Sequence, residues 1–386
     1  MEILLQSKLP QVGSSIFSVM SQLAAQENAM NMAQGFPEFD PPASLIEYIH
    51  EGMCNGKNQY APMPGYLSFR EIIAQKEWEL HQLNLSPDSQ ITVVPGATVG
   101  LFAAIQAFVG IGDEVVIIEP AYDSYEPAIT LAGGKAVRVS MDLNNFTIPW
   151  NKVKDSFTQN TKMIIINTPH NPLGTIMKHQ DWLELRDIVL NSHAVVLSDE
   201  VYEHMVFDDC NHESVLSIEG LENRSIKVSS FGKTFHSTGW KMGYLCASEE
   251  LTQEIRKVYQ FLAFSCNSAA QFGLEKFMKQ NAHWERELSL FYQSKRDLFQ
   301  SKLKDSNWEL LPCEGSYFQI LKYSGHNELN YLTDIDLAQY LTKNAKIASI
   351  PVGSFCENHE KTGLLRFCFA KNDDTLLKAT EILCTL

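Results

Sequence analysis

The segment SSFGKTFHSTGWKMG, residues 229–243, says more about the fold and chemistry of this chain than any other stretch. It places Lys233 among small residues, directly after an apolar run with the composition of a buried strand. A second cation, Lys241, and the hydroxyls of Ser229 and Ser230 lie close by in the sequence. Because the segment also contains glycines, its backbone can approach a bound ligand closely. It therefore predicts a lysine at a strand end, beside groups that can bind an anion.

This combination suits a lysine that forms a Schiff base with an aldehyde cofactor. Burial and a neighbouring cation lower the pKa of a lysine, which keeps its amine neutral and able to attack an aldehyde. A hydroxyl donor and a permanent positive charge would bind a phosphate group. The pattern therefore favours pyridoxal phosphate (PLP) on Lys233. A lone Ser-x-x-Lys is more often an ordinary strand end with solvated lysines, but the Thr-Gly-Trp-Lys-x-Gly continuation makes this pattern far more specific.

The segment resembles the lysine motif of the class I aminotransferases, which are PLP enzymes of fold type I. Within that family it is most similar to the branch that contains methionine, kynurenine and glutamine-K transaminases. Motifs of the branch recur from Gln34 to Phe369, so the resemblance covers nearly the whole chain. It implies an α/β fold with a large domain, residues 45–280, built on a mostly parallel mixed sheet. Residues 1–44 and 281–386 would together form a smaller α+β domain.

Length and composition agree with such an enzyme. The chain has 386 residues, more than one ordinary domain of about 100–200 residues needs. Its net charge of −15 argues against binding to nucleic acid or to an anionic membrane. No apolar run approaches the roughly 18 residues of a membrane span, and no signal peptide is visible, so we expect a cytoplasmic protein. Eight cysteines without a Cys-x-x-Cys pattern, and histidines without metal spacing, predict reduced thiols and no metal.

Short apolar runs alternate with helical patterns through the predicted large domain. The runs are nearly continuous in Val, Ile and Leu, which is typical of strands covered on both faces. Such alternation predicts a mostly parallel sheet with helices on both sides. The predicted strands are Ile91–Val94, Glu114–Ile118, Met163–Asn167, Ala194–Ser198, Ile226–Ser229 and Tyr244–Ala247. The predicted helices between and after them are Val99–Val109, Lys178–Leu190 and Glu250–Phe261.

The pattern changes after about residue 280. A long charged helix is predicted there, followed by short strands of the smaller domain. These elements are Trp284–Lys304 for the helix, and Trp308–Leu311, Tyr317–Leu321 and Leu365–Phe369 for the strands.

Polar residues that can bind a ligand stand at the carboxyl ends of several predicted strands. Ala97 and Thr98 follow the first strand and open a helix. Asn167 and Asp199 each mark a strand end, and Ser230 marks another. In an open parallel sheet, ligands bind outside the carboxyl ends of the strands. We therefore expect these separate strand ends to converge on one ligand.

The resemblance implies a role for each of these residues toward the cofactor. The N–H groups of Ala97 and Thr98 would bind the phosphate at a helix N-terminus. Ser230 and Lys241 would complete the phosphate site. Asp199 would keep the pyridine nitrogen protonated, so that the ring can accept electrons from the substrate.

Further residues would surround the cofactor ring. Asn171 and Tyr202 would hydrogen-bond the ring O3′, and Tyr122 would stack on the ring. Tyr60 would reach the phosphate of the neighbouring subunit, so the resemblance implies a homodimer with shared active sites. Taken alone, Asp199 could instead be a helix N-cap, Asn171 a turn residue and Tyr202 a packed aromatic.

The resemblance also implies a substrate site at Gly35, Asn171 and Arg366. The guanidinium of Arg366 would bind the substrate α-carboxylate through two hydrogen bonds. The alternative is an exposed arginine on an edge strand, which the flanking apolar residues disfavour. The freed amine of the active-site lysine would act as general base and acid at the substrate Cα. The predicted catalytic residues are Lys233, Asp199 and Tyr202.

The leading functional hypothesis is a PLP-dependent aminotransferase that moves the amino group of an apolar, aromatic or sulfur amino acid, methionine foremost, to a 2-oxo acid. No second arginine is assigned to a distal carboxylate. Aromatic surface from Phe36, Tyr60, Tyr122 and Phe264 would suit a thioether. Ser265 replaces a histidine of the kynurenine-type relatives, which makes this segment more similar to bacterial methionine aminotransferases.

Two other functions remain open on the sequence. A PLP-dependent β-lyase that cleaves C–S bonds would use the same carbanion, so the motifs do not separate it from a transaminase. A non-catalytic PLP-fold binding domain is disfavoured because Lys233, Asp199 and Arg366 are all present. A dehydrogenase is disfavoured because the chain lacks a Gly-x-Gly-x-x-Gly fingerprint.

Overall fold

The computed structural model describes residues 6–326, 328–357 and 361–386. Its largest element is a seven-stranded sheet, in which β8 runs antiparallel to both neighbours and the other paired strands are parallel. This confirms the predicted mostly parallel mixed sheet. In spatial order the strands are β2 (Ile91–Val94), β8 (Gly243–Ala247), β7 (Ser225–Ser230), β6 (Val195–Asp199), β5 (Thr161–Asn167), β3 (Glu114–Glu119) and β4 (Lys135–Ser140).

One strand of this sheet, β4, is absent from the sequence-based prediction. Its sequence, KAVRVS, mixes polar and apolar residues, and only Val139 is buried. The strand lies at the sheet edge beside β3, where solvent reaches it. A search for continuous apolar runs therefore misses it, because such runs mark strands covered on both faces.

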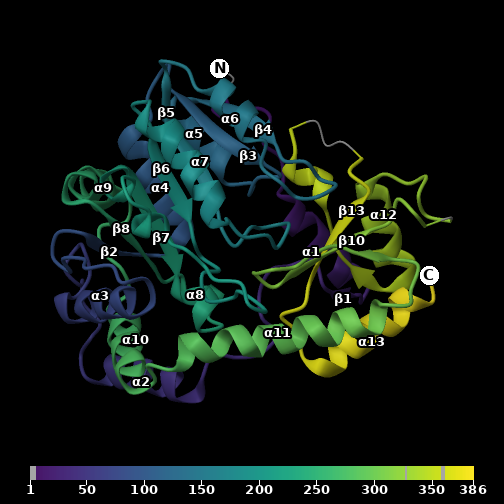
Figure 1. Ribbon diagram of the computed structural model, residues 1–386. Coiled ribbons are helices and arrows are strands. Elements are labelled where there is room, and N and C mark those ends of the chain that lie inside the picture. Colours follow the sequence, from purple (N-terminus) through teal and green to yellow (C-terminus); the bar gives the residue numbers. More distant parts are fainter. Residues whose placement is uncertain (1–5, 327, 358–360) are drawn as a thin grey trace, which may run out of the picture.

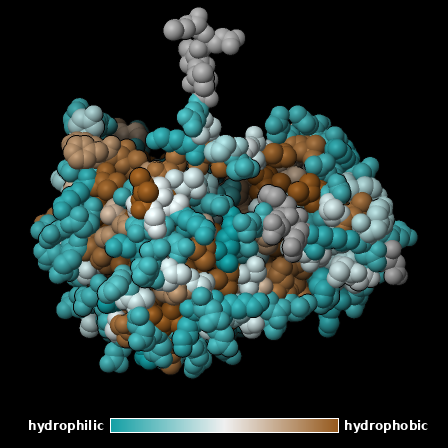
Figure 2. Space-filling model, turned by 90° about the horizontal axis from the view of Figure 1, so that it is seen from above, coloured by the Kyte–Doolittle hydropathy of each residue, from teal (hydrophilic) through white to brown (hydrophobic). Residues whose placement is uncertain are grey.

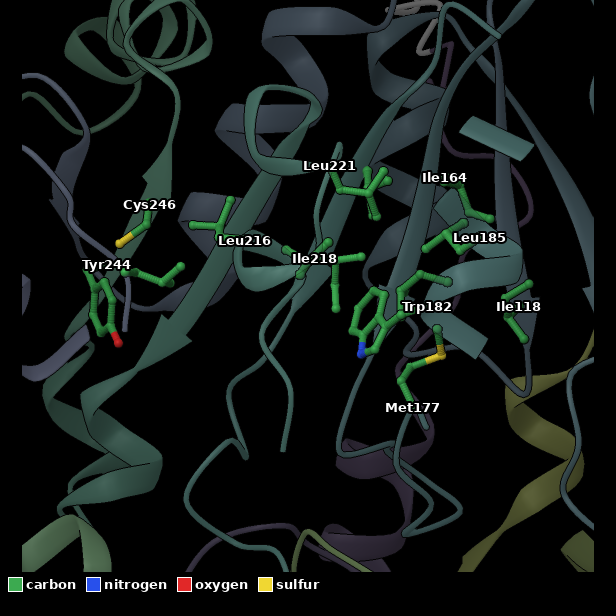
Figure 3. Packing of buried hydrophobic residues seen from close by; sticks show 14 of the residues in the cluster. Ile118, Ile164, Met177, Trp182, Leu185, Leu216, Ile218, Leu221, Tyr244 and Cys246 are labelled. Carbon is green, nitrogen blue, oxygen red and sulfur yellow. The ribbon is translucent and has the colours of Figure 1, made fainter. Parts of the chain in front are cut away.

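Helices cover both faces of the sheet, and alternate side chains of each strand enter separate cores. Val116 and Ile118 of β3 pack in one core, whereas Val115 and Ile117 pack in the other. Figure 3 shows part of the first core, where Trp182 and Leu185 lie near Ile118. The longer helices that contribute to the first core are α2 (Ala43–Cys54), α3 (Leu67–His81), α7 (His179–Leu190) and α10 (Ser268–Gln280). Those of the second are α4 (Ala97–Phe108), α5 (Tyr125–Ala132) and α9 (Glu249–Leu262).

A second unit contains a smaller, antiparallel sheet. Its strands, in spatial order, are β12 (Ile350–Pro351), β13 (Leu364–Cys368), β10 (Phe318–Lys322) and β9 (Glu309–Leu310). Its helices are α11 (Trp284–Leu303), α12 (Asp334–Tyr340) and α13 (Asp373–Cys384). Helix α11 runs along one side of both units and packs against α13 (Figure 1).

The N-terminal segment packs against this second unit. Strand β1 (Met30–Asn31) pairs in parallel with β11 (Ile347–Ala348), and helix α1 (Ile16–Gln26) contacts both strands. Met20 and Ala24 of α1 enter a third core together with residues of β10 and β13. The N-terminal segment and the C-terminal part of the chain therefore pack together. The domain boundaries near residues 45 and 280 stay a prediction.

Short helical segments connect the main elements. They are α6 (Trp150–Ser156), α8 (Phe231–Thr234), the 3-10 turns Val215–Ser217, Glu222–Arg224, Thr238–Trp240 and Val352–Phe355, and the π-helical turn Leu341–Ala345. Helix α8 follows β7 directly and carries Lys233. On the face seen in Figure 2, hydrophilic residues surround separate hydrophobic areas. Within the described residues, no helix is both long and apolar enough to cross a membrane.

Candidate active site

A cavity of about 250 Å³ collects almost every residue that the sequence predicts for the site. It lies at the carboxyl ends of β5 and β6, beside the start of α4, and residues of the N-terminal segment and of the second unit close it. The predicted residues that line it are Gly35, Ala97, Thr98, Tyr122, Asn171, Asp199, Tyr202, Ser230, Lys233, Lys241 and Arg366. Of the predicted set, Tyr60 alone does not line it.

Lys233 lies at the centre of a small hydrogen-bonding group. Its Nζ donates to the carbonyl oxygen of Gly35 over 3.1 Å and to the hydroxyl oxygen of Tyr317 over 2.9 Å. Burial, together with the nearby charges of Arg366 and Lys241, lowers the pKa of Lys233 to about 8. The amine is therefore much easier to deprotonate than that of an exposed lysine.

Asp199 ends strand β6 beside Asn167, its partner across the β5–β6 ladder. Burial raises the pKa of Asp199 to about 6, while the hydroxyl of Tyr125, which donates to Oδ2 over 2.7 Å, opposes that rise. Residues 201–204 form a turn and no helix follows Asp199, so Asp199 is not the N-cap of a helix here. The carboxyl group faces the cavity and is available to a cationic partner.

The start of α4 has the features of a phosphate site. Its N-cap is Gly96, and no side chain caps the helix, so the first N–H groups face the cavity. A Cβ on Gly96 would lie 3.3 Å from Nζ of Lys241, and a Cβ on Gly243 would lie 3.0 Å from the backbone nitrogen of Ala97. Both glycines therefore allow close packing around an anion. The lysine supplies the positive charge that a phosphate needs.

Arg366 is fully buried on β13, so it is not a surface arginine. Its two terminal nitrogens donate over 2.6 Å to Oδ1 of Asn171 and to the carbonyl oxygen of Ala33. Its Nε is buried without a hydrogen-bond partner among the described residues. The guanidinium also stacks on the ring of Phe318, with 3.9 Å between its central carbon and the ring centre. A buried guanidinium with an unpaired donor suits a carboxylate ligand.

The predicted aromatic lining is only partly correct. Tyr122 lines the cavity, and burial raises its pKa to about 12. Tyr60 is 83% exposed and lies against Phe264, with 5.3 Å between ring centres, at a hollow separate from the main cavity. Phe36 and Phe264 do not line the cavity either, whereas Phe17 and Phe318 do. Within one chain, the apolar wall is thus built largely from residues that the motifs do not contain.

Three residues near the reacting groups are missing from the sequence-based prediction. Tyr125 holds Asp199, Tyr317 holds Lys233, and Phe17 of α1 packs beside Tyr122, with 6.3 Å between ring centres. Each contact joins positions far apart in the sequence. Tyr317 is the first residue of a predicted strand, but nothing in its local sequence indicates a hydrogen bond to the lysine.

Comparison with known proteins agrees with this geometry. The family model for class I and II aminotransferases matches residues 27–383. The methionine aminotransferase of Escherichia coli (strain K12) is 44% identical over 376 residues, which cover 97% of each chain. The crystal structure of Escherichia coli YbdL, described as having a methionine aminotransferase function, matches with a TM-score of 0.97 at 43% identity and covers 100% of both chains.

More distant relatives extend the comparison. The kynurenine–oxoglutarate transaminase of Dictyostelium discoideum is 32% identical over 413 residues, which cover 97% of this chain and 94% of that protein. The structure of N-succinyldiaminopimelate aminotransferase from Mycobacterium tuberculosis matches with a TM-score of 0.94 at 31% identity, covering 99% of this chain and 100% of the other. Because the family model spans most of the chain and the relatives span nearly all of it, this protein belongs to the class I and II aminotransferases.

Proposed function

We propose that this aminotransferase binds PLP in the cavity around Lys233 and transfers the amino group of methionine, and of similar apolar amino acids, to a 2-oxo acid. One observation carries the proposal. A lysine with a lowered pKa, a buried carboxyl group, an uncapped helix N-terminus beside a lysine and a buried arginine all line the same cavity. Aminotransferases of this family use PLP, and each of these groups fits one part of PLP or of the amino acid substrate.

The chain's own residues would hold both cofactor and substrate. The start of α4, Ser230 and Lys241 would bind the phosphate, and Asp199 would keep the pyridine nitrogen protonated. Bound PLP would supply an electron sink for the pair left on the substrate Cα. Arg366 would bind the α-carboxylate, with Asn171 holding the guanidinium in place.

Lys233 would move the proton. With its pKa lowered to about 8, a fraction of the amine is neutral near neutral pH, so Nζ can take the proton from the substrate Cα. The resulting ammonium would then give that proton to a different carbon, C4′ of the bound cofactor, which makes one residue both base and acid. Tyr202 lies beside this amine, with 5.4 Å from Nζ to its ring centre, and would help position the cofactor.

The preference for methionine rests on the lining of the cavity and on the relatives. Phe17, Leu101 and Phe318 give it apolar surface, and a thioether packs favourably against aromatic rings. Arg366 is the only arginine among the lining residues, so none is left for a second carboxylate of aspartate or glutamate. Burying one thioether contributes only about 1.5–3 kcal/mol, so we expect a modest preference over leucine or phenylalanine.

A half-reaction screen tests this function. Purified protein loaded with PLP is mixed with methionine, phenylalanine, leucine, aspartate or kynurenine, and the loss of visible cofactor absorbance is followed. We expect methionine to react fastest and to give its 2-oxo acid. Lys233→Ala is the control and should show no reaction. Borohydride reduction followed by peptide mapping should place the cofactor on Lys233.

Three results would contradict parts of the proposal. Label on another lysine would overturn the cofactor site. A higher specificity constant for aspartate would overturn the apolar substrate class. Pyruvate and ammonia from a cysteine conjugate, formed without any 2-oxo acid acceptor, would identify a C–S β-lyase.

A further inference from the structure

The hydroxyl of Tyr317 occupies a place that the function described so far does not explain. Tyr317 is fully buried just before β10, and its ring packs between those of Tyr202 and Tyr292, with 5.1 and 5.6 Å between ring centres. Its oxygen nevertheless lies 2.9 Å from Nζ of Lys233. A buried tyrosine hydroxyl that only fills space needs no contact with the reacting amine.

The hydrogen bonds around this hydroxyl have a definite direction. Tyr317 has one O–H, and it donates this hydrogen to the carbonyl oxygen of Gly35 over 2.6 Å, while the hydroxyl of Tyr202 also interacts with the hydroxyl of Tyr317. The tyrosine oxygen is then left as an acceptor for an N–H of Lys233. The same carbonyl of Gly35 accepts a second N–H of Lys233 over 3.1 Å. Two acceptors from distant parts of the chain therefore converge on one amine.

The number of acceptors matches the neutral amine. A neutral lysine carries two N–H groups and one lone pair, whereas the ammonium form carries three N–H groups. Here the two N–H groups are used by Tyr317 and Gly35, and the lone pair stays free to accept a proton. Gly35 cannot carry a larger side chain, since a Cβ there would lie 2.8 Å from the ring of Phe318. The group is thus closely packed and leaves the amine little freedom.

We propose that Tyr317 is a positioning residue for the Lys233 amine, holding it as the base that takes the substrate Cα proton whenever that amine is free of the cofactor. This inference rests on the proposed function. It adds a residue from the second unit to the catalytic group, so that the base is in place only when the N-terminal segment, α8 and the entry to β10 are packed together.

The charged and titratable groups that face this amine come from several elements. They are Asp199, Tyr202, Lys241, Tyr317, Arg366 and Cys368. Tyr317→Phe removes one acceptor from the amine, together with the hydrogen bond that Tyr317 donates to Gly35 and its interaction with the Tyr202 hydroxyl. Because an acceptor stabilises the ammonium form, its loss should lower the pKa of Lys233 further.

The test uses two full-length variants. Tyr317→Phe removes the hydroxyl that contacts Lys233. Tyr292→Phe removes a neighbouring buried hydroxyl that has no hydrogen-bond partner among the described residues, and it serves as the matched control. The pKa of Lys233 is measured in cofactor-free protein by competitive labelling of amines at a series of pH values, with mass spectrometry of the lysine peptide.

The second measurement uses methionine carrying deuterium at Cα. We expect Tyr317→Phe to lower kcat about tenfold with a small change in KM, and to raise the deuterium isotope effect on kcat. The isotope effect should rise because a poorly held base makes proton transfer more nearly rate-limiting. The labelled pKa of Lys233 should fall by about one unit. Tyr292→Phe should match the wild-type protein in all of these quantities.

The outcomes separate this inference from the proposed function. If the Lys233 pKa of Tyr317→Phe equals that of the control, the positioning role is wrong, whatever happens to turnover. If turnover falls while the isotope effect is unchanged, the hydroxyl acts outside proton transfer and the role is again wrong. If the wild-type protein fails to transaminate, the proposed function fails, while the labelling experiment still tests the contact itself.

Discussion

At the scale of single residues, Asp199 shows how burial and one hydrogen bond act in opposite directions on a carboxyl group. Burial raises its pKa to about 6, and the Tyr125 hydroxyl, 2.7 Å from Oδ2, stabilises the charged form. A pyridinium nitrogen would bind the charged form better than the neutral one. Binding of PLP by the cofactor-free protein should therefore weaken as the pH falls through about 6.

Tyr125→Phe should move that weakening to higher pH. Removing a donor from a carboxylate raises its pKa, so Asp199 becomes neutral at a less acidic pH. The measurement is PLP affinity between pH 5 and 8 for wild-type protein, Tyr125→Phe and Asp199→Ala. The alanine variant is the control and should bind weakly at every pH. Coinciding pH profiles for wild type and Tyr125→Phe would show that the tyrosine does not tune this carboxyl group.

Whether a site residue could be predicted depends on how its neighbours are arranged along the chain. Lys233 and Lys241 belong to one continuous motif, so local sequence indicates them. Tyr125 contacts Asp199 across 74 positions, and Tyr317 contacts Lys233 across 84. No local pattern encodes such pairs, because they meet only through the order of strands in the sheet and the packing of the second unit.

At the scale of elements, strand β7 presents residues toward the candidate site on one face and toward a buried cluster of ion pairs on the other. Val228 and Ser230 lie on the side of the cavity and of α4. On the opposite face, Lys227 contacts Glu77 of α3 and Ser229 contacts Glu203. Lys227 is fully buried, and its ammonium lies 2.7 Å from carboxylate oxygens of Glu77 and Glu203. The apolar pattern predicts the strand correctly, but a lysine inside it gives no hint of a buried ion cluster.

Lys227→Met should destabilise the protein strongly. The change leaves Glu77 and Glu203 buried with less positive charge, and breaking a buried pair from one side costs about 3–5 kcal/mol. Urea unfolding at pH 7 measures the loss. Lys257→Met is the matched control, since Lys257 pairs with Glu254 on an exposed helix face and should cost less than about 1 kcal/mol. Equal unfolding free energies for the two variants would contradict a stabilising role for the cluster.

The cluster also lies directly behind the site. Glu200 and Glu203 adjoin Asp199 and Tyr202 in the sequence, and their side chains point into the cluster. Charge interactions of Glu200 and Glu203 therefore hold the short turn after β6, while Asp199, Val201 and Tyr202 line the cavity. This arrangement connects the stability of one element to the geometry of the site.

At the scale of the whole molecule, the sequence predicts the main sheet because its strands are long, apolar and spaced by helices. It does not predict the strand order, the edge strand β4, or the two-residue strands β1, β11 and β12, which are too short to carry a pattern. The cavity depends on this long-range assembly, since its walls come from the N-terminal segment, the main sheet and β13.

The surface around Tyr60 bears on the assembly of two chains. Tyr60 is 83% exposed, and Phe264 and Met53 nearby are 51% and 48% exposed. An exposed apolar patch of this kind commonly marks a surface for interaction with another protein chain. We propose that a second copy of the chain covers them, and that Tyr60 then reaches the partner's phosphate site, as the family resemblance implies.

A subunit-mixing experiment tests this arrangement. Chains with Lys233→Ala are co-expressed with chains carrying Tyr60→Ala, and the mixed population is assayed. In a two-fold dimer with shared sites, each hybrid has one site with both changes and one site with neither. Hybrids form half of a random mixture, so about a quarter of all sites should be intact. Activity should therefore recover to about a quarter of the wild-type value, although each variant alone is nearly inactive.

The control pair is Lys233→Ala with Arg366→Ala. Both residues line the cavity of their own chain, so every site in these hybrids keeps one change and activity should not recover. Equal activities for the two mixtures, or an active monomer in sedimentation, would show that Tyr60 does not serve the neighbouring site.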